Sequence, residues 1–319
     1  MKCIYMSLIA FALGAFCAFP SEGGDWFSCP AEITLQIVDE NGQPIEGVDV
    51  EGYFWSPYTH DAVGDPFVVR TDKDGKCLLV GTGYRSLAGV ARAVGYYPTE
   101  FDISLGDKNL AHEQGRWSLQ SSTVILKGMR NPIPMYANRV VAYIPEQNKP
   151  IGFDMEKGDW IIPYGKGRVS DFVVNYTTRQ EAVHQYMKQM HFSVPTTRGG
   201  FFVKKLDLFS AFVSDYSAPA DEYIPSYLFE QKRTPERIET SKDLQDDEYF
   251  IIRSRVVTND AGEVVSANYS KIYGPIRYAL WRNQKRIEFV YYFNPTPNDR
   301  NLEFDMSRNL LPGGQVNKP

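Results

Sequence analysis

The side chains that could carry metal chemistry are few and poorly spaced for it. The chain of 319 residues holds four histidines, whereas a zinc site needs three or four ligands at constrained spacing. His184 and His191 would share one helix face without a third ligand, and His112 begins a zinc-protease pattern that lacks its second histidine. The sequence therefore predicts no metal and no other cofactor.

Acidic residues are abundant, and a pair of carboxylates is what a glycoside hydrolase needs. With 39 Asp and Glu residues, however, coincidental pairs are unavoidable. The sequence has no Gly-x-Ser-x-Gly nucleophile elbow and no complete phosphate-binding loop. We expect a protein that is not an enzyme. The alternative is a glycan-active enzyme with an Asp/Glu pair that the sequence does not mark.

Two tryptophans offer surfaces on which sugar rings could stack. Trp160 begins a short apolar run, and Trp281 precedes polar residues 282–284 in an expected turn. An exposed aromatic platform at Trp160 and Trp281 would bind a glycan. The alternative is core packing, which accounts for most tryptophans in β-proteins.

The stretch 294–305 concentrates prolines, amides and charges directly after an aromatic strand. It would serve as a ligand or partner loop, or as an interdomain brace that faces the Asn-Pro-Ile-Pro turn at 131–134. Its candidate residues are Asn294, Asp299, Arg300 and Asn301. We expect the brace, with the guanidinium of Arg300 held in bidentate pairs by the acidic residues at 299, 303 and 305.

Composition favours β-structure and excludes one class of partner. Aromatic residues are 14% of the chain, and Tyr and Phe suit half-buried sheet surfaces. The formal net charge of −5 is the opposite of the basic footprint that nucleic acid requires. We therefore expect an all-β protein that binds another protein or a glycan and no nucleic acid.

The N-terminus has the pattern of a targeting segment. A positive charge precedes an apolar run at 4–18, which is shorter than the ~20 residues of a membrane span. We expect a signal peptide over residues 1–18, a mature chain that starts near Ala18 or Phe19, and no transmembrane segment in that mature chain. Such a protein is exported to the periplasm, the outer envelope or the cell exterior. Lipidation of Cys17 is the less favoured alternative, because a bulky phenylalanine precedes it.

Alternating apolar residues and turn-forming residues predict strands after a linker at 19–29. In residues 33–37 the strongly apolar Ile33, Leu35 and Ile37 alternate with polar residues. Residues 39–42 have the composition of a hairpin turn. The X-Pro pairs at 131–134 predict a domain boundary. We expect two β-sandwich-type domains, over residues 30–130 and 131–319.

Three landmarks in the first domain resemble those of carboxypeptidase regulatory-like domains, a transthyretin-like β-sandwich family. They lie at 38–50 (VDENGQPIEGVDV), 71–75 (TDKDG) and 94–98 (VGYYP), in the order found in that family. The resemblance covers about residues 30–127. It implies a β-sandwich that acts as a structural or interaction module, without peptidase activity. Stretches of the second domain resemble uncharacterised exported bacterial proteins, which implies no function.

Two cysteines remain beyond the signal peptide. In an exported protein, Cys29 and Cys77 suggest one disulfide. The alternative is two unpaired thiols, one of them packed as a small apolar group near the strand at 78–80. We expect the disulfide, in an exported, non-enzymatic binding or structural module.

Overall fold

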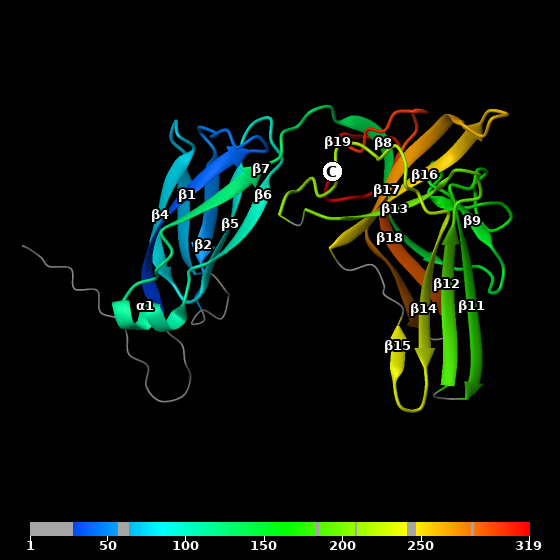
Figure 1. The fold of residues 1–319 in the computed structure, drawn as a ribbon, viewed down its shortest axis with the longest axis horizontal. Helices are drawn as coiled ribbons and strands as arrows, with labels where there is room; N and C mark the ends of the chain where they lie inside the picture. The colour runs from blue at the N-terminus through cyan, green and yellow to red at the C-terminus, as the bar shows by residue number, and fades with distance from the viewer. Residues whose placement is uncertain (1–27, 57–63, 183–184, 208, 241–246, 282–283) are drawn as a thin grey trace, which may run out of the picture. The chain divides into compact units, whose positions relative to one another are not determined.

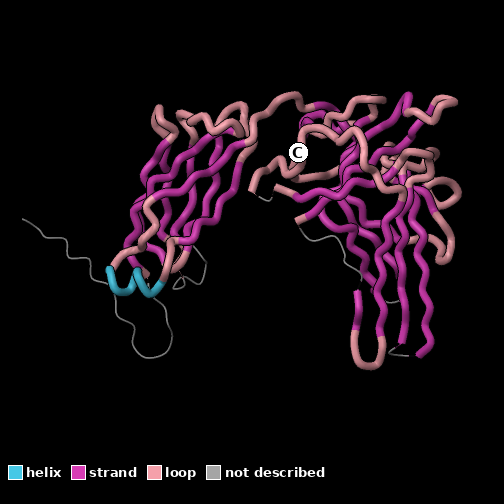
Figure 2. Tube along the Cα trace, viewed as in Figure 1, coloured by secondary structure: helices cyan, strands magenta, loops and turns pink. Residues whose placement is uncertain are grey.

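The protein is built almost entirely of β-strands, which confirms the predicted all-β class. The computed structural model describes residues 28–56, 64–182, 185–207, 209–240, 247–281 and 284–319. Nineteen strands and one short helix lie in these ranges (Figure 2). The predicted signal peptide and Cys17 lie outside them. No helix of the described ranges is long and apolar enough to cross a membrane.

The chain divides between Gly128 and Met129 into two compact units, whereas the sequence predicted a boundary after residue 130. The first unit pairs its strands in two sheets, of order β4-β1-β7 and β3-β2-β5-β6 (Figure 1). The elements are β1 (Cys29–Asp39), β2 (Asp49–Phe54), β3 (Asp65–Arg70), β4 (Lys76–Gly83), β5 (Ser86–Arg92), β6 (Thr99–Ser104), α1 (Lys108–Gln114) and β7 (Ser121–Leu126).

The two sheets of the first unit enclose one apolar core. Ile33, Leu35 and Ile37 of β1 are fully buried in it, because alternate residues of a strand point to the same face. Gly75 makes the turn into β4 with a φ of +72°, and a Cβ there would lie 2.6 Å from the carbonyl oxygen of Ile37. Glycine is therefore required at this turn by both conformation and space.

The predicted Cys29–Cys77 disulfide is wrong. These two cysteines, the ones among the described residues, are both buried and form no disulfide. In the antiparallel β1–β4 pair, Cys77 lies opposite Leu35, whereas Cys29 lies opposite Gly83. Six residues of strand separate the two positions by about 20 Å, whereas a disulfide requires Cα atoms within about 7 Å.

The second unit contains two six-stranded sheets, of order β10-β9-β11-β12-β14-β15 and β13-β16-β17-β18-β8-β19 (Figure 1). Its strands are β8 (Ile133–Tyr143), β9 (Ile151–Asp154), β10 (Asp159–Trp160), β11 (Phe172–Ala182), β12 (Gln185–Ser193), β13 (Gly200–Lys205), β14 (Ser226–Arg233), β15 (Ile238–Thr240), β16 (Glu248–Thr258), β17 (Val264–Trp281), β18 (Gln284–Asn294) and β19 (Phe304–Asn309).

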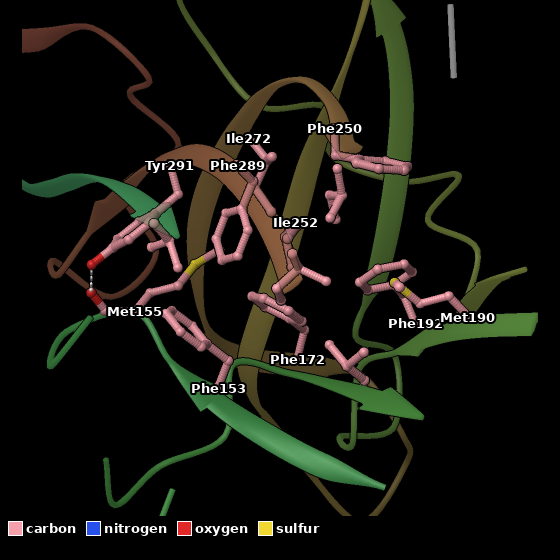
Figure 3. Packing of buried hydrophobic residues seen from close by; sticks show 14 of the residues in the cluster. Phe153, Met155, Phe172, Met190, Phe192, Phe250, Ile252, Ile272, Phe289 and Tyr291 are labelled. Carbon is pink, nitrogen blue, oxygen red and sulfur yellow. Dashed lines mark hydrogen bonds between the residues drawn. The ribbon is translucent and has the colours of Figure 1, made fainter. Parts of the chain in front are cut away.

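An aromatic core joins the two sheets of the second unit. Phe153 and Phe172 from the first sheet pack against Phe289 from the second, with ring centroids 5.4 to 5.7 Å apart (Figure 3). Tyr291 extends this core and donates its hydroxyl to the carbonyl oxygen of Met155 at 2.7 Å. Buried aromatic pairs of this kind contribute about 0.5–1.5 kcal/mol each beyond the area that they bury.

The second of these sheets is buried on its inner face and on part of its outer face. Beyond the aromatic core, its other face carries Tyr249, Tyr269 and Tyr292, which are all buried. Leu302 and Phe304 pack on that face from the segment after β18. The burial of Leu302 and Phe304 fixes the segment after β18 against the sheet.

Candidate functional site

The predicted loop after β18 is organised around Asn294, which is fully buried. The amide nitrogen of Asn294 donates to the backbone carbonyls of Asp299 and Asn301, both at 3.1 Å, and to the carboxylate of Asp299 at 3.0 Å. Its side-chain oxygen accepts from the backbone nitrogen of Thr296 at 3.0 Å. The donors and acceptors of Asn294 are thus used to shape the loop rather than to meet a ligand.

The rest of the loop holds the start of the second unit. The side-chain amide of Asn301 donates to the carbonyl oxygen of Asn131 at 2.7 Å. The carboxylate of Glu303 accepts from the backbone nitrogens of Arg130 at 2.8 Å and Asn131 at 2.6 Å. These bonds brace two segments of one unit, whereas the sequence predicted a brace between domains.

The predicted role of Arg300 is wrong. Its side chain is exposed, and within the described part of the chain its guanidinium forms no ion pair. The acidic residues around it have other partners: Asp299 binds Asn294, and Asp305 binds Arg308. The backbone carbonyl of Arg300 accepts from the backbone nitrogen of Ala218 at 2.8 Å.

Trp160 cannot form the predicted exposed platform, because only 4% of it is accessible. Its ring packs edge-on against Phe153, and its indole nitrogen donates to the carbonyl oxygen of Tyr143 at 3.0 Å. Trp160 is therefore a core residue of the second unit. Trp281 ends β17, but its side chain lies outside the described part of the structure.

Two buried acids, Asp154 and Asp171, and the partly exposed Glu156 surround Arg255 in β16. Its guanidinium donates to both carboxylate oxygens of Asp171, at 2.9 and 3.0 Å, to Glu156 at 2.9 Å and to Asp154 at 3.1 Å. Arg255 adopts a φ of +51°, at an irregularity in the β16–β17 pairing. A non-glycine residue in this conformation costs about 1–3 kcal/mol, and the surrounding hydrogen bonds offset that cost.

The acids of this cluster take part in the hydrogen bonding of the fold. Burial raises the pKa of Asp171, against the opposing effect of its hydrogen bond from Arg255. The hydrogen bond from Arg255 lowers the pKa of Glu156. Asp154 also accepts backbone bonds from Arg168 and Val169, at 2.8 and 3.1 Å. Bonded in this way, the carboxylates are committed to holding the turn between β9 and β11.

No metal centre accompanies these acids. Across the described ranges, no group of three or more His, Cys, Asp or Glu side chains is placed to hold a metal ion. Of the four histidines of the chain, His191 is exposed in β12, His112 lies in α1, and His60 and His184 lie outside the described ranges.

A pocket of about 600 Å³ opens on the outer face of β1 and β4 in the first unit. This volume falls within the usual range of small-molecule sites. Its polar lining consists of Glu32, Thr34, Gln114, Arg116, Ser118 and Gln120. Its apolar lining includes Leu78 and Val80, which are 50% and 61% exposed. A pocket with both kinds of surface can hold a ligand that has polar groups and an apolar face.

The polar wall of the pocket is held in place by Trp117. The indole nitrogen of Trp117 donates to the carbonyl oxygen of Gly83 at 2.8 Å, and its backbone nitrogen donates to Pro30 at 3.0 Å. Trp117 is buried in the core, so its neighbours Arg116 and Ser118 point outward in this extended segment. The backbone of this part of the lining is therefore fixed to the core of the unit.

Helix α1 sets where this segment begins. The carboxylate of Asp107 caps the helix by accepting from the backbone nitrogens of Asn109 and Leu110, at 2.7 and 3.2 Å. Gly115 ends it in the left-handed conformation, with a φ of +68°. The chain then turns back along β1, where Gln120 accepts a backbone bond from Thr34 at 2.9 Å. Capping signals in the sequence could have marked α1, but not the pocket beside it.

Three solved structures show similarity to this chain at low identity. A streptococcal ancillary pilin is 12% identical, over 82% of this chain and 58% of the pilin chain, with a TM-score of 0.23. A DUF3823 family protein from Parabacteroides merdae is 11% identical, over 83% of this chain and 99% of that one, with a TM-score of 0.22. A Bacteroides fragilis protein of unknown function is 11% identical, over 84% and 98% of the two chains, with a TM-score of 0.19.

This chain thus spans less than two thirds of the length of the pilin. No protein-family model and no curated protein matches the chain. The resemblance of the first unit to carboxypeptidase regulatory-like domains therefore stays a prediction from the sequence.

Proposed function

We propose that this protein is an exported, non-enzymatic binding module whose first unit takes a neutral glycan in the pocket on β1 and β4. The lining of that pocket carries the proposal. Thr34, Ser118 and the glutamines supply hydrogen-bond donors and acceptors, and Leu78 and Val80 supply an apolar surface. A sugar ring presents the same combination of hydroxyl groups and an apolar face.

The charge of the lining favours a neutral ligand. Glu32 and Arg116 have opposite charges, and the other polar side chains of the lining are uncharged. A ligand with a strong net charge would gain from one of the two residues and lose to the other.

The acids of the second unit support a role without catalysis. A glycoside hydrolase needs one carboxyl group that gives up its proton and one that stays ionised and free to act. Asp154, Glu156 and Asp171 are instead bonded to Arg255. Export is supported by the N-terminal apolar run, which has the length of a signal-peptide core.

An array of neutral oligosaccharides, probed with the mature protein, tests this proposal. The matched variants are Arg116→Ala/Gln120→Ala, which removes two side chains of the polar wall, and Lys73→Ala, an exposed change in the turn before β4. We expect the double variant to lose roughly tenfold or more in affinity, equivalent to about 1.4 kcal/mol, and the control variant to bind like the wild type. The proposal would be overturned if the double variant bound the array as tightly as the wild type, or if the wild type bound none of the oligosaccharides.

A further inference from the structure

The inner face of the second unit changes from aromatic to cationic at one end of its sheets. Alternate residues of a strand share a face, so Lys188 continues the inner face of Met190 in β12. In the same way Arg233 lies four residues from the core residue Phe229, on β14. Lys285 lies two residues from the core residue Ile287, on β18.

Strand pairing brings these cations together. Lys188 lies opposite Gln231, and Tyr186 lies opposite Arg233, so Lys188 and Arg233 are diagonal neighbours on one face. Desolvation lowers the pKa of Lys188, and the charge of Lys285 on the facing sheet lowers it further. Three cationic side chains therefore converge on one space between the ends of the two sheets.

Two of these cations have buried nitrogen atoms that lack a hydrogen-bond partner. Within the described part of the chain, neither Nζ of Lys285 nor Nε of Arg233 has an acceptor. The ammonium of Lys285 lies 4.8 Å from the centroid of the Tyr176 ring. That ring attracts a cation, but it cannot accept the three hydrogen bonds that an ammonium group can donate.

The carboxylates of the same strands lie on the opposite face. Glu230 accepts from the side-chain amide of Gln189 at 2.6 Å. Gln189 follows Lys188 in β12, so its side chain lies on the outer face while that of Lys188 lies on the inner face. Glu288 binds Arg139 on the outer side of β18. The described residues therefore provide the inner cations with no ion pair. A cationic group that lacks a hydrogen-bond acceptor is costly to hold away from water, so these partly buried side chains favour an anionic ligand.

We propose that Lys188, Arg233 and Lys285 form a site for the anionic group of an acidic oligosaccharide. The group is a sulfate ester or a uronate carboxylate, because both present several oxygens to ammonium and guanidinium donors. The partly buried ring of Tyr186 beside the cations adds a surface for the sugar that carries the charge. This site belongs to the second unit and is independent of the neutral pocket proposed in the first.

Calorimetric titration of the wild type with a chondroitin sulfate oligosaccharide and with a uronate oligosaccharide tests the proposal. The variant Lys188→Gln/Lys285→Gln removes two charges, and Lys232→Gln removes one from the exposed side of β14 as a control. We expect binding of one of the two acidic probes, weakened tenfold or more in the double variant and unchanged in the control. Binding should also weaken as salt is raised.

Three results would overturn the site. They are no heat of binding with either acidic probe, equal affinity of the wild type and the double variant for the acidic probes, and an equal loss of binding to a neutral dextran oligosaccharide in the double variant. Each variant must melt in the same range as the wild type, and Lys188→Gln alone replaces the double variant if that one unfolds. The comparison of variants does not depend on the first unit, because the substituted residues Lys188, Lys232 and Lys285 all lie in the second.

Discussion

Asn294 and Arg300 show how far residue type alone can mislead. Both stand in the same unusual stretch of sequence, and a guanidinium among acidic residues suggested the stronger interaction. The structure buries the neutral amide and exposes the charged side chain. An amide can donate and accept at once, which the tight loop requires, whereas the acids near Arg300 are already bonded to other groups.

The free energy of unfolding should reflect this difference. We expect Asn294→Ala to lower it by about 2 kcal/mol, because several buried hydrogen bonds lose their partner. Arg300→Ala should change it by less than about 0.5 kcal/mol, as is usual for an exposed side chain without partners. Denaturant unfolding of both variants measures the two values. A larger loss for Arg300→Ala than for Asn294→Ala would contradict the assignment.

At the scale of elements, the sequence predicted regular pieces better than their partners. The turn at 39–42 and the alternation in β1 follow from local chemistry and are found as predicted. Residues 179–182 and 185–190 lie in the paired strands β11 and β12, whose inner face contributes Tyr176, Met190 and Phe192 to the aromatic core. Helix α1 was not predicted, since it has only seven residues and depends on its caps.

Sites built from distant segments were not predictable in this way. The pocket draws on three stretches of the first unit, around residues 30–34, 78–81 and 114–120. Arg255 stands in a mostly apolar strand, and its acids lie about a hundred residues earlier. No local pattern marks such pairs, because pairing of strands across the fold brings them together.

The β9–β11 connection should depend on pH through Glu156. The hydrogen bond from Arg255 lowers the pKa of Glu156 in the folded protein, so its stabilising effect is present above the ordinary value of 4.5. That effect is lost as the pH falls through the lowered pKa. At pH 7 we expect Glu156→Gln to lower the free energy of unfolding by about 1 kcal/mol. The variant should therefore melt at a lower temperature than the wild type.

Melting curves of the wild type and of Glu156→Gln between pH 7 and pH 3 measure this effect. The gap between the two melting temperatures should be constant above about pH 5 and should close below pH 4.5. The exposed glutamate variant Glu46→Gln serves as a control for general effects of charge. A gap that widens towards pH 3 would show that the ionised carboxylate does not stabilise the fold.

At the scale of the whole molecule, two β-rich units provide surfaces of different chemistry. The first has a pocket whose charges balance, and the second has a group of cations on the inner face of its sheets. We infer that one exported chain holds two kinds of sugar, a neutral one in the first unit and an acidic one in the second. The formal net charge of −5 predicted a protein that does not bind nucleic acid. A net charge gives no information about a local group of cations.

Native mass spectrometry of the mature protein with its best neutral oligosaccharide tests the central claim most directly, since one spectrum reports both binding and the fate of the ligand. We predict a one-to-one complex whose mass equals that of the protein plus the intact oligosaccharide. This complex should persist over hours and should be lost in Arg116→Ala/Gln120→Ala. Shortened oligosaccharides released by the wild type, or an equally abundant complex in that variant, would contradict a non-enzymatic module that binds glycan in the pocket of its first unit.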